Sequence, residues 1–252
     1  MTAESRQQQI LELLAARGRV TNADLAVRFT VSEMTLRRDL AQLEQAGLLR
    51  RVHGGATPTE SGSFEPPFAI RARLHHDAKR AIAAGVAREV RDGQTIVLDG
   101  GTTGTAVAEA LVGRDVTVCA LNLRVAEILA SSPATRVMVP GGSVRHGELS
   151  FSGPAAERTL ADHRFDLFVM TVSAVDATAG FTEWNVGDAA VKRAAVSVSG
   201  RCIVACDSSK FGHIAFARIG GLEVADLIVT DADLDVDLRA QLTVIGATVQ
   251  VA

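Results

Sequence analysis

Apolar residues recur every three or four positions in three stretches near the start of the chain. They are Ile10, Leu11 and Leu14; Leu25, Ala26 and Phe29; and Leu36, Leu40 and Leu43. This spacing places each set on one face of a helix. Thr21 and Ser32 stand where side-chain caps begin the second and third helices, and Gly18 and Gly47 stand where the first and third end. The pattern predicts three helices, the last two short and joined by a tight turn.

The residues after Gly47 predict a small hairpin. Leu48 to Ala56 reads as two short strands that turn near Gly54 and Gly55, with basic side chains along one edge. A three-helix unit followed by such a hairpin is typical of a winged helix-turn-helix, in which the third helix lies in the DNA major groove. We expect this small α+β domain to cover residues 1–56.

The outward face of this unit is basic. With Leu36 and Leu40 turned to the core, Arg37 and Arg38 face solvent or DNA. The alternative is a protein-binding module whose arginines are only a solvated face. Basic groups on separate elements favour DNA, and the residues expected to contact it are Thr21, Ser32, Met34, Thr35, Arg37, Arg38, Arg50, Arg51 and His53.

Residues 57–73 lack apolar periodicity and contain the only Pro-Pro pair, Pro66-Pro67, which predicts a linker. From residue 74 to 252, strand-like and helix-like stretches alternate. Expected strands are 95–98, 116–121, 136–139, 166–172, 201–205 and 227–230; expected helices are 79–90, 105–111, 123–130, 155–162 and 188–199. Short, doubly apolar strands separated by helices predict an α/β domain with a mostly parallel sheet flanked by helices.

Polar and glycine-rich segments follow several of these strands. In an open parallel sheet, ligands bind beyond the carboxyl ends of the strands. The residues that we expect at such a site are Asp99, Gly100, Gly101, Thr102, Thr103, Gly104, Asn122, Gly141, Gly142 and Lys210. A glycine- and threonine-rich loop that runs into a helix suits an anion such as phosphate, although each residue also has a structural reading as a turn or cap. The loop lacks the spacing of nucleotide-binding motifs, so we expect no cofactor.

Composition narrows the class of protein. Apolar residues make up 47% and no apolar run is long enough to span a membrane, so we expect no membrane association. The first nine residues have no signal-peptide core, which makes the cytoplasm the expected location. Residues 1–56 hold eight Arg against six acids, whereas the whole chain has a net charge of −3. The three cysteines lie in apolar runs and are expected to be buried thiols, and we expect no metal site.

The motifs resemble those of the DeoR family. The stretch Val31-Ser-Glu-Met-Thr-Leu-Arg-Arg-Asp-Leu40 and the later His53-Gly-Gly-Ala56 are similar to the family signature. The second half resembles the family's sensor domain at Asp99 to Thr103, Asn122, Gly141-Gly142, Gly180 and Asp207-Ser-Ser-Lys-Phe211. Two departures occur: Ala120-Leu121 precede Asn122 where Thr-Asn is common, and Gly187-Asp188 replace a frequent Glu-Ala.

The resemblance implies a repressor of carbohydrate-metabolism genes whose sensor domain is similar to ribose-5-phosphate isomerase. It implies that Arg37 and Arg38 contact double-stranded operator DNA and that Asp39 orients an arginine or caps locally. It also implies a phosphorylated sugar as the effector, with the 99–104 loop and Lys210 as phosphate partners. The sugar, the operator sequence and the regulated genes cannot be read from the residues.

Two other functions remain open at this level. An isomerase needs several carboxylates and a lysine at the sugar, but after the strand at 166–172 we find only Asp176, so we expect no enzyme. A sugar-phosphate isomerase with a DNA-binding head is the alternative. A second domain that only oligomerises is a third possibility. In each case we expect a homo-oligomer, because one helix-turn-helix covers too little DNA for strong specificity.

Overall fold

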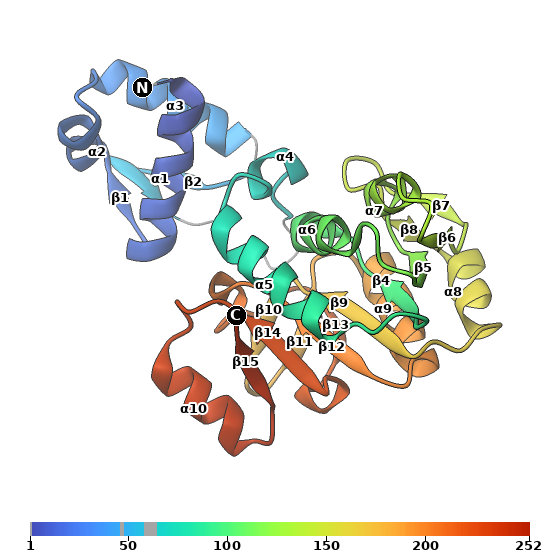
Figure 1. Cartoon of the computed structure of the whole chain (residues 1–252). Helices are drawn as coiled ribbons and strands as arrows, with labels where there is room; N and C mark the ends of the chain where they lie inside the picture. Colours follow the sequence, from blue (N-terminus) through green and yellow to red (C-terminus); the bar gives the residue numbers. More distant parts are fainter. Residues whose placement is uncertain (1, 46–47, 58–64) are drawn as a thin grey trace. The chain divides into compact units, whose positions relative to one another are not determined.

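The computed structural model describes residues 2–45, 48–57 and 65–252, which divide into two units, Met1–Leu74 and His75–Ala252 (Figure 1). The elements of the first unit are α1 (Ala3–Arg17), β1 (Val20–Thr21), α2 (Asn22–Phe29), α3 (Glu33–Gln45), β2 (Arg50–Val52), β3 (Gly55–Thr57) and α4 (Phe68–Arg71). The three predicted helices and the hairpin are therefore present. Gly47 and residues 58–64 of the predicted linker lie outside the described residues, and α4 falls within the rest of that linker.

The first unit packs around one apolar cluster. The side chains that the sequence pattern assigns to the core, including Ile10, Leu25, Leu36 and Leu40, are buried together. The hairpin strand β3 pairs antiparallel with both β1 and β2 and so closes a three-stranded sheet. Gly55 is needed there, because a Cβ at that position would lie 2.0 Å from the carbonyl oxygen of Val20.

A buried ion pair joins α1 to α3. Arg6 and Asp39 are 7% and 3% exposed, and Arg6 Nε donates to Asp39 Oδ2 at 2.5 Å while Arg6 Nη2 donates to Oδ1 at 3.2 Å. The prediction that Asp39 orients an arginine is confirmed, and the arginine comes from α1. The pair ties α3, the helix that carries Arg37 and Arg38, to α1.

The second unit is an α/β domain. Its helices are α5 (His76–Glu89), α6 (Gly101–Leu111), α7 (Leu123–Ala130), α8 (Pro154–Ala161), α9 (Val186–Val198) and α10 (Val236–Val244), with short 3₁₀ turns at Ser208–Lys210 and Leu222–Val224. Its main sheet has the strand order β15-β14-β12-β9-β4-β5-β6, with every neighbouring pair parallel. These strands are β4 (Thr95–Leu98), β5 (Thr117–Ala120), β6 (Arg136–Met138), β9 (Leu167–Thr171), β12 (Cys202–Ala205), β14 (Leu227–Thr230) and β15 (Val249–Val251).

Alternate residues of each central strand pack into two separate apolar clusters, one on each face of the main sheet. Leu167 and Val169 of β9 pack in a cluster with side chains of α5, α6 and α7, whereas Phe168 and Met170 pack with α8 and α9. Because both faces of the sheet are covered, its central strands carry apolar side chains on both faces, which is the pattern that predicted this architecture. The predicted α/β fold with a parallel sheet is confirmed.

Two smaller sheets were not predicted. β10 (Ala174–Asp176), β11 (Gly180–Glu183) and β13 (Ala217–Gly220) form an antiparallel sheet, and β7 (Ser143–Val144) pairs with β8 (Phe151–Ser152). Their strands are too short to carry a clear periodicity. They matter here because β11 and the β7–β8 hairpin bring charged side chains to the carboxyl edge of the main sheet.

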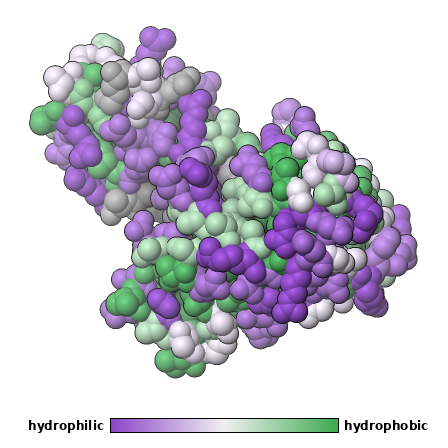
Figure 2. Space-filling model, in the orientation of Figure 1, coloured by the Kyte–Doolittle hydropathy of each residue, from purple (hydrophilic) through white to green (hydrophobic). Residues whose placement is uncertain are grey.

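The surface of the second unit carries both polar and apolar side chains (Figure 2). Figure 2 shows apolar side chains at the surface in the region of α10, where Val236 is 73% and Val244 is 85% exposed. None of the helices that the structure describes is long and apolar enough to cross a membrane. Cys119, Cys202 and Cys206 are buried free thiols, as predicted.

The Arg6–Asp39 pair generates a stability prediction. Asp39→Ala leaves the Arg6 guanidinium buried without its partner and should destabilise the first unit by about 3–5 kcal/mol. Arg37→Ala is the matched control, because it breaks the exposed Arg37–Glu33 pair of the same helix and should cost about 0.5 kcal/mol or less.

Guanidinium unfolding followed by circular dichroism measures both variants. Trp184, the only tryptophan, lies in the second unit, so its fluorescence monitors that unit separately. If Asp39→Ala lowers the free energy of unfolding no more than Arg37→Ala does, the buried Arg6–Asp39 pair does not stabilise the first unit as we propose.

Candidate functional site

Two hydroxyl caps position the helix-turn-helix. Thr21 Oγ1 accepts a hydrogen bond from Asp24 N at 3.1 Å, and Ser32 Oγ accepts one from Thr35 N at 3.2 Å. The hydroxyls of Ser32 and Thr35 also lie 2.9 Å apart, within hydrogen-bond distance. These bonds satisfy amide groups that a helix leaves unpaired at its first turn. Thr21, Ser32 and Thr35 therefore fix where α2 and α3 begin.

One face of α3 is exposed and carries the predicted contact residues. Met34 is 74% exposed, and the Arg37 side chain is 63% exposed with its guanidinium 3.3 Å from Glu33 Oε2. Arg38 is also exposed, and its side chain makes no hydrogen bond or ion pair with any residue that the structure describes. Since residues three and four apart lie on one side of a helix, Met34, Arg37 and Arg38 share a face.

The hairpin adds basic groups at its edge. Arg50 and His53 are exposed, and His53 stands at the turn before Gly54. Arg51 is held differently: its Nε lies 2.5 Å from Glu44 Oε2 and its amide donates to Glu44 Oε1 at 2.9 Å. These hydrogen bonds lower the pKa of the Glu44 carboxyl. Arg51 therefore joins the hairpin to α3, with its charge partly balanced.

In the second unit, the Asp99 carboxylate is used inside the protein. Asp99 Oδ1 accepts from Gly100 N at 2.7 Å, and Oδ2 accepts from the amide and the hydroxyl of Thr171 at 3.0 and 2.9 Å. Lys192 Nζ lies 3.0 Å from the same Oδ2. Asp99 therefore holds the end of β4 against the end of β9 through its side-chain hydrogen bonds.

Lys192 is the centre of a buried charge network. It is 5% exposed, its Nζ donates to Thr171 O at 2.9 Å, and it forms ion pairs with Asp99 and Glu183. Burial alone would lower the pKa of Lys192, but the charges of Asp99 and Glu183 outweigh it and raise the pKa. Burial would likewise raise the pKa of Glu183, but Lys192 and the hydroxyl of Ser173 hold it below its usual value. Both groups are charged at neutral pH.

Two glycines and Asn122 allow the loops after β4, β5 and β6 to pack closely against their neighbours. A Cβ on Gly100 would lie 2.7 Å from Asn122 Nδ2, and one on Gly142 would lie 2.6 Å from Ser152 O. Asn122 is 1% exposed, caps α7 through Arg124 N at 2.8 Å, and donates from Nδ2 to Glu148 O at 2.8 Å. Gly141 and Gly142 both have positive φ, which suits glycine. Asn122 thus shapes the site through side-chain hydrogen bonds to backbone groups, and Gly142 does so by allowing close backbone packing.

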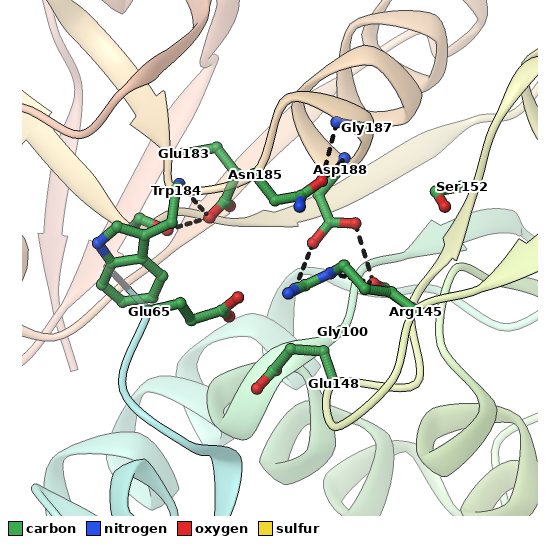
Figure 3. Close-up of polar contacts among 12 residues, drawn as sticks. Glu65, Gly100, Arg145, Glu148, Ser152, Glu183, Trp184, Asn185, Gly187 and Asp188 are labelled. Carbon is green, nitrogen blue, oxygen red and sulfur yellow. Dashed lines mark hydrogen bonds and ion pairs between the residues drawn. The ribbon is translucent and has the colours of Figure 1, made fainter. Parts of the chain in front are cut away.

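The start of α9 faces the loop between β7 and β8. Figure 3 shows Asp188 linked to Arg145: Arg145 Nη2 donates to Asp188 Oδ2 at 2.6 Å, and Ser150 Oγ donates to Oδ1 at 2.9 Å. Asp188 is 9% exposed, and burial raises its pKa even though Arg145 opposes the shift. Asn185 caps α9 by accepting from Gly187 N and Asp188 N.

Lys210 lies at the end of the turn after β12. Its Nζ stands 5.0 Å from the centroid of the Trp184 ring, a cation–π contact. Asp207 in the same turn is buried, which would raise its pKa, but the charge of Lys210 and the hydroxyl of Ser209 lower it. One strand, β9, separates β12 from β4, so the ends of these two strands are about 10 Å apart.

The first turn of α6 has the features that the sequence analysis expected of an anion site. Gly101 begins the helix, with half-buried Thr102 and buried Thr103 in its first turn. The first amides of a helix have no acceptor within it and carry partial positive charge. Gly104 lets α6 pack closely, since a Cβ there would lie 2.4 Å from Asp99 O. The arrangement can bind a small anion with neighbouring hydroxyl groups.

Sequence reasoning missed several charged residues of this edge. Glu183 ends β11, Asp188 and Lys192 lie on α9, and Arg145 follows β7, so none of them follows a strand of the main sheet. Asp176 is the one carboxylate in the segment just after β9, as the sequence indicates, but other segments bring Asp99, Glu183 and Asp188 to the same edge of the sheet. One signal was available: Lys192 is one of only three lysines in the chain.

Two family models match the chain. Residues 6–61 match the DeoR-like helix-turn-helix domain, and residues 74–232 match the DeoR C terminal sensor domain. The first match lies within the first unit, and the second covers most of the second unit.

Curated relatives match over almost the full length. The chain is 32% identical to an HTH-type transcriptional regulator GlpR of Haloferax volcanii, over 99% of this chain and 98% of that protein. It is 32% identical to the glycerol-3-phosphate regulon repressor of Escherichia coli K12, over 96% of each chain, and 35% identical to the transcriptional repressor AccR of Agrobacterium fabrum, over 92% and 90%.

Among solved structures, ribose 5-phosphate isomerase A of Methanocaldococcus jannaschii matches 54% of this chain and 55% of that one, with 16% identity and a TM-score of 0.41. We draw no conclusion from that similarity. The family models and the full-length relatives agree that this chain belongs to the DeoR family of helix-turn-helix transcriptional regulators.

Proposed function

We propose that the protein is a repressor that binds double-stranded operator DNA through α3 and the β2–β3 hairpin. The observation that carries this is the exposed face of α3, where Arg38 stands beside Arg37 with no partner among the described residues. An unpaired guanidinium on such a face suits a phosphate or a guanine. Thr21, Ser32 and Thr35 support the interface by fixing the helix starts.

The second part of the proposal concerns the effector. A phosphorylated sugar would place its phosphate at the first turn of α6, near Lys210, and its hydroxyls toward the polar groups along the same edge. Asp99, Asn122 and Gly142 would shape this site rather than contact the phosphate. The names of relatives that regulate glycerol-3-phosphate genes support a phosphorylated, hydroxyl-bearing ligand.

The regulator would act in the cytoplasm as a homo-oligomer. Two heads would contact half-sites spaced by about one helical turn, ~34 Å, or by a multiple of it. Sedimentation velocity of the full chain should therefore give at least twice the monomer mass. A monomer at the concentrations where operator binding saturates would contradict this part.

If Arg38 contacts a base, Arg38→Ala should lower the affinity for operator DNA by about 1–3 kcal/mol. The affinity for DNA of unrelated sequence should then fall by less. An equal loss for both DNAs would indicate a phosphate contact. Arg17→Ala is the control, since it removes the same charge at the end of α1. Fluorescence anisotropy at fixed salt measures each affinity, and unchanged operator binding by Arg38→Ala would refute the interface.

The effector is tested by the same titration with pentose, hexose and glycerol phosphates. One of them should weaken operator binding at least tenfold, a coupling of about 1.4 kcal/mol. Lys210→Gln should reduce this response and leave operator affinity without sugar unchanged. Arg136→Gln is the matched control, because Arg136 begins β6 at the opposite edge of the sheet. If no phosphate in the panel changes operator affinity, the effector proposal fails and the DNA-binding proposal stands.

A further inference from the structure

Two large apolar side chains are mostly exposed among the described residues of the first unit: Val27 at 82% and Met34 at 74%. Isolated exposed apolar residues are common on protein surfaces and indicate nothing by themselves. The position of Met34 distinguishes it. It is the second residue of α3, one helical turn before Arg37 and Arg38 and on the same face.

The backbone around Met34 is held in place. Ser32 Oγ accepts from Thr35 N, and the two hydroxyls bond to each other. The buried Arg6–Asp39 pair holds the opposite side of the helix to α1. Because its backbone is fixed, Met34 has a defined position beside Arg37 and Arg38 when α3 binds DNA.

The chemistry of the side chain selects the base. A methionine thioether donates no hydrogen bond and accepts only weakly, so it gains nothing from the polar edges of guanine, adenine or cytosine. In the major groove, thymine alone presents an apolar group, its C5-methyl. We propose that Met34 contacts the C5-methyl group of one thymine in each operator half-site and makes that position specific for thymine. This inference rests on the proposed DNA-binding function.

The test replaces each thymine of the operator in turn by deoxyuridine, which keeps the pairing edge and the O4 acceptor and lacks only the methyl group. The operator comes from the region upstream of the protein's own gene, and the full-length protein is titrated at fixed salt. At one thymine per half-site the wild-type protein should lose about fourfold in affinity, which corresponds to the ~0.8 kcal/mol of burying one methyl group.

Variants identify the side chain responsible. Met34→Ala should abolish the thymine–uracil difference at that position alone, and Met34→Leu should retain it. Val27→Ala is the matched control, because it truncates the other exposed apolar side chain, on α2. Thr35→Ser removes the methyl group of the residue next to Met34 and keeps the hydroxyl that pairs with Ser32.

The results of these titrations either support or overturn the proposed contact of Met34 with thymine. A difference that Met34→Ala abolishes and the controls keep supports the inference. A wild-type protein insensitive to every uracil overturns it, as does a difference that survives Met34→Ala or is lost in Thr35→Ser instead; in these cases operator binding itself persists and the proposed function stands. If the wild-type protein binds the operator no better than unrelated DNA, the proposed function fails first and the inference with it.

Discussion

The side chain of Lys192 joins three segments at the carboxyl edge of the main sheet. Its ammonium group contacts Asp99 at the end of β4, the carbonyl of Thr171 at the end of β9, and Glu183 at the end of β11. Removing one member of a buried ionic group leaves the others uncompensated, so the network acts as a unit. The loop that begins α6 takes its shape from Asp99 and therefore depends on this lysine.

The first unit depends on an analogous contact. Arg6 and Asp39 form a buried pair between α1 and α3, and the exposed residues of α3 take their direction from it. In both units, a charged group that the sequence associates with function is buried and positions its neighbours. Asp39 and Asp99 lie beside the groups suited to a partner, Arg38 in one case and the α6 amides in the other.

The parts that sequence could predict are those set by local chemistry. The caps at Thr21 and Ser32, the helical spacing of Leu36 and Leu40, and the apolar strands covered on both faces each follow from a few neighbouring residues. Arg145, Asp188 and Lys192 could not be predicted in this way, because their roles come from segments that meet only in the folded chain. The sequence did place Asp99 and Asn122 near the site, yet it could not tell that their side chains are used internally.

If effector and operator bind to coupled sites, each must change the affinity of the other by the same factor, and this reciprocity tests the proposed coupling most directly. The affinity of the proposed effector, the sugar phosphate that weakens operator binding, is measured by calorimetry for the free protein and for the protein saturated with operator. We predict that operator DNA weakens sugar binding by the same factor by which the sugar weakens operator binding. Equal sugar affinity with and without operator would contradict the proposal, because the effector site at the first turn of α6 would then be uncoupled from the DNA-binding unit.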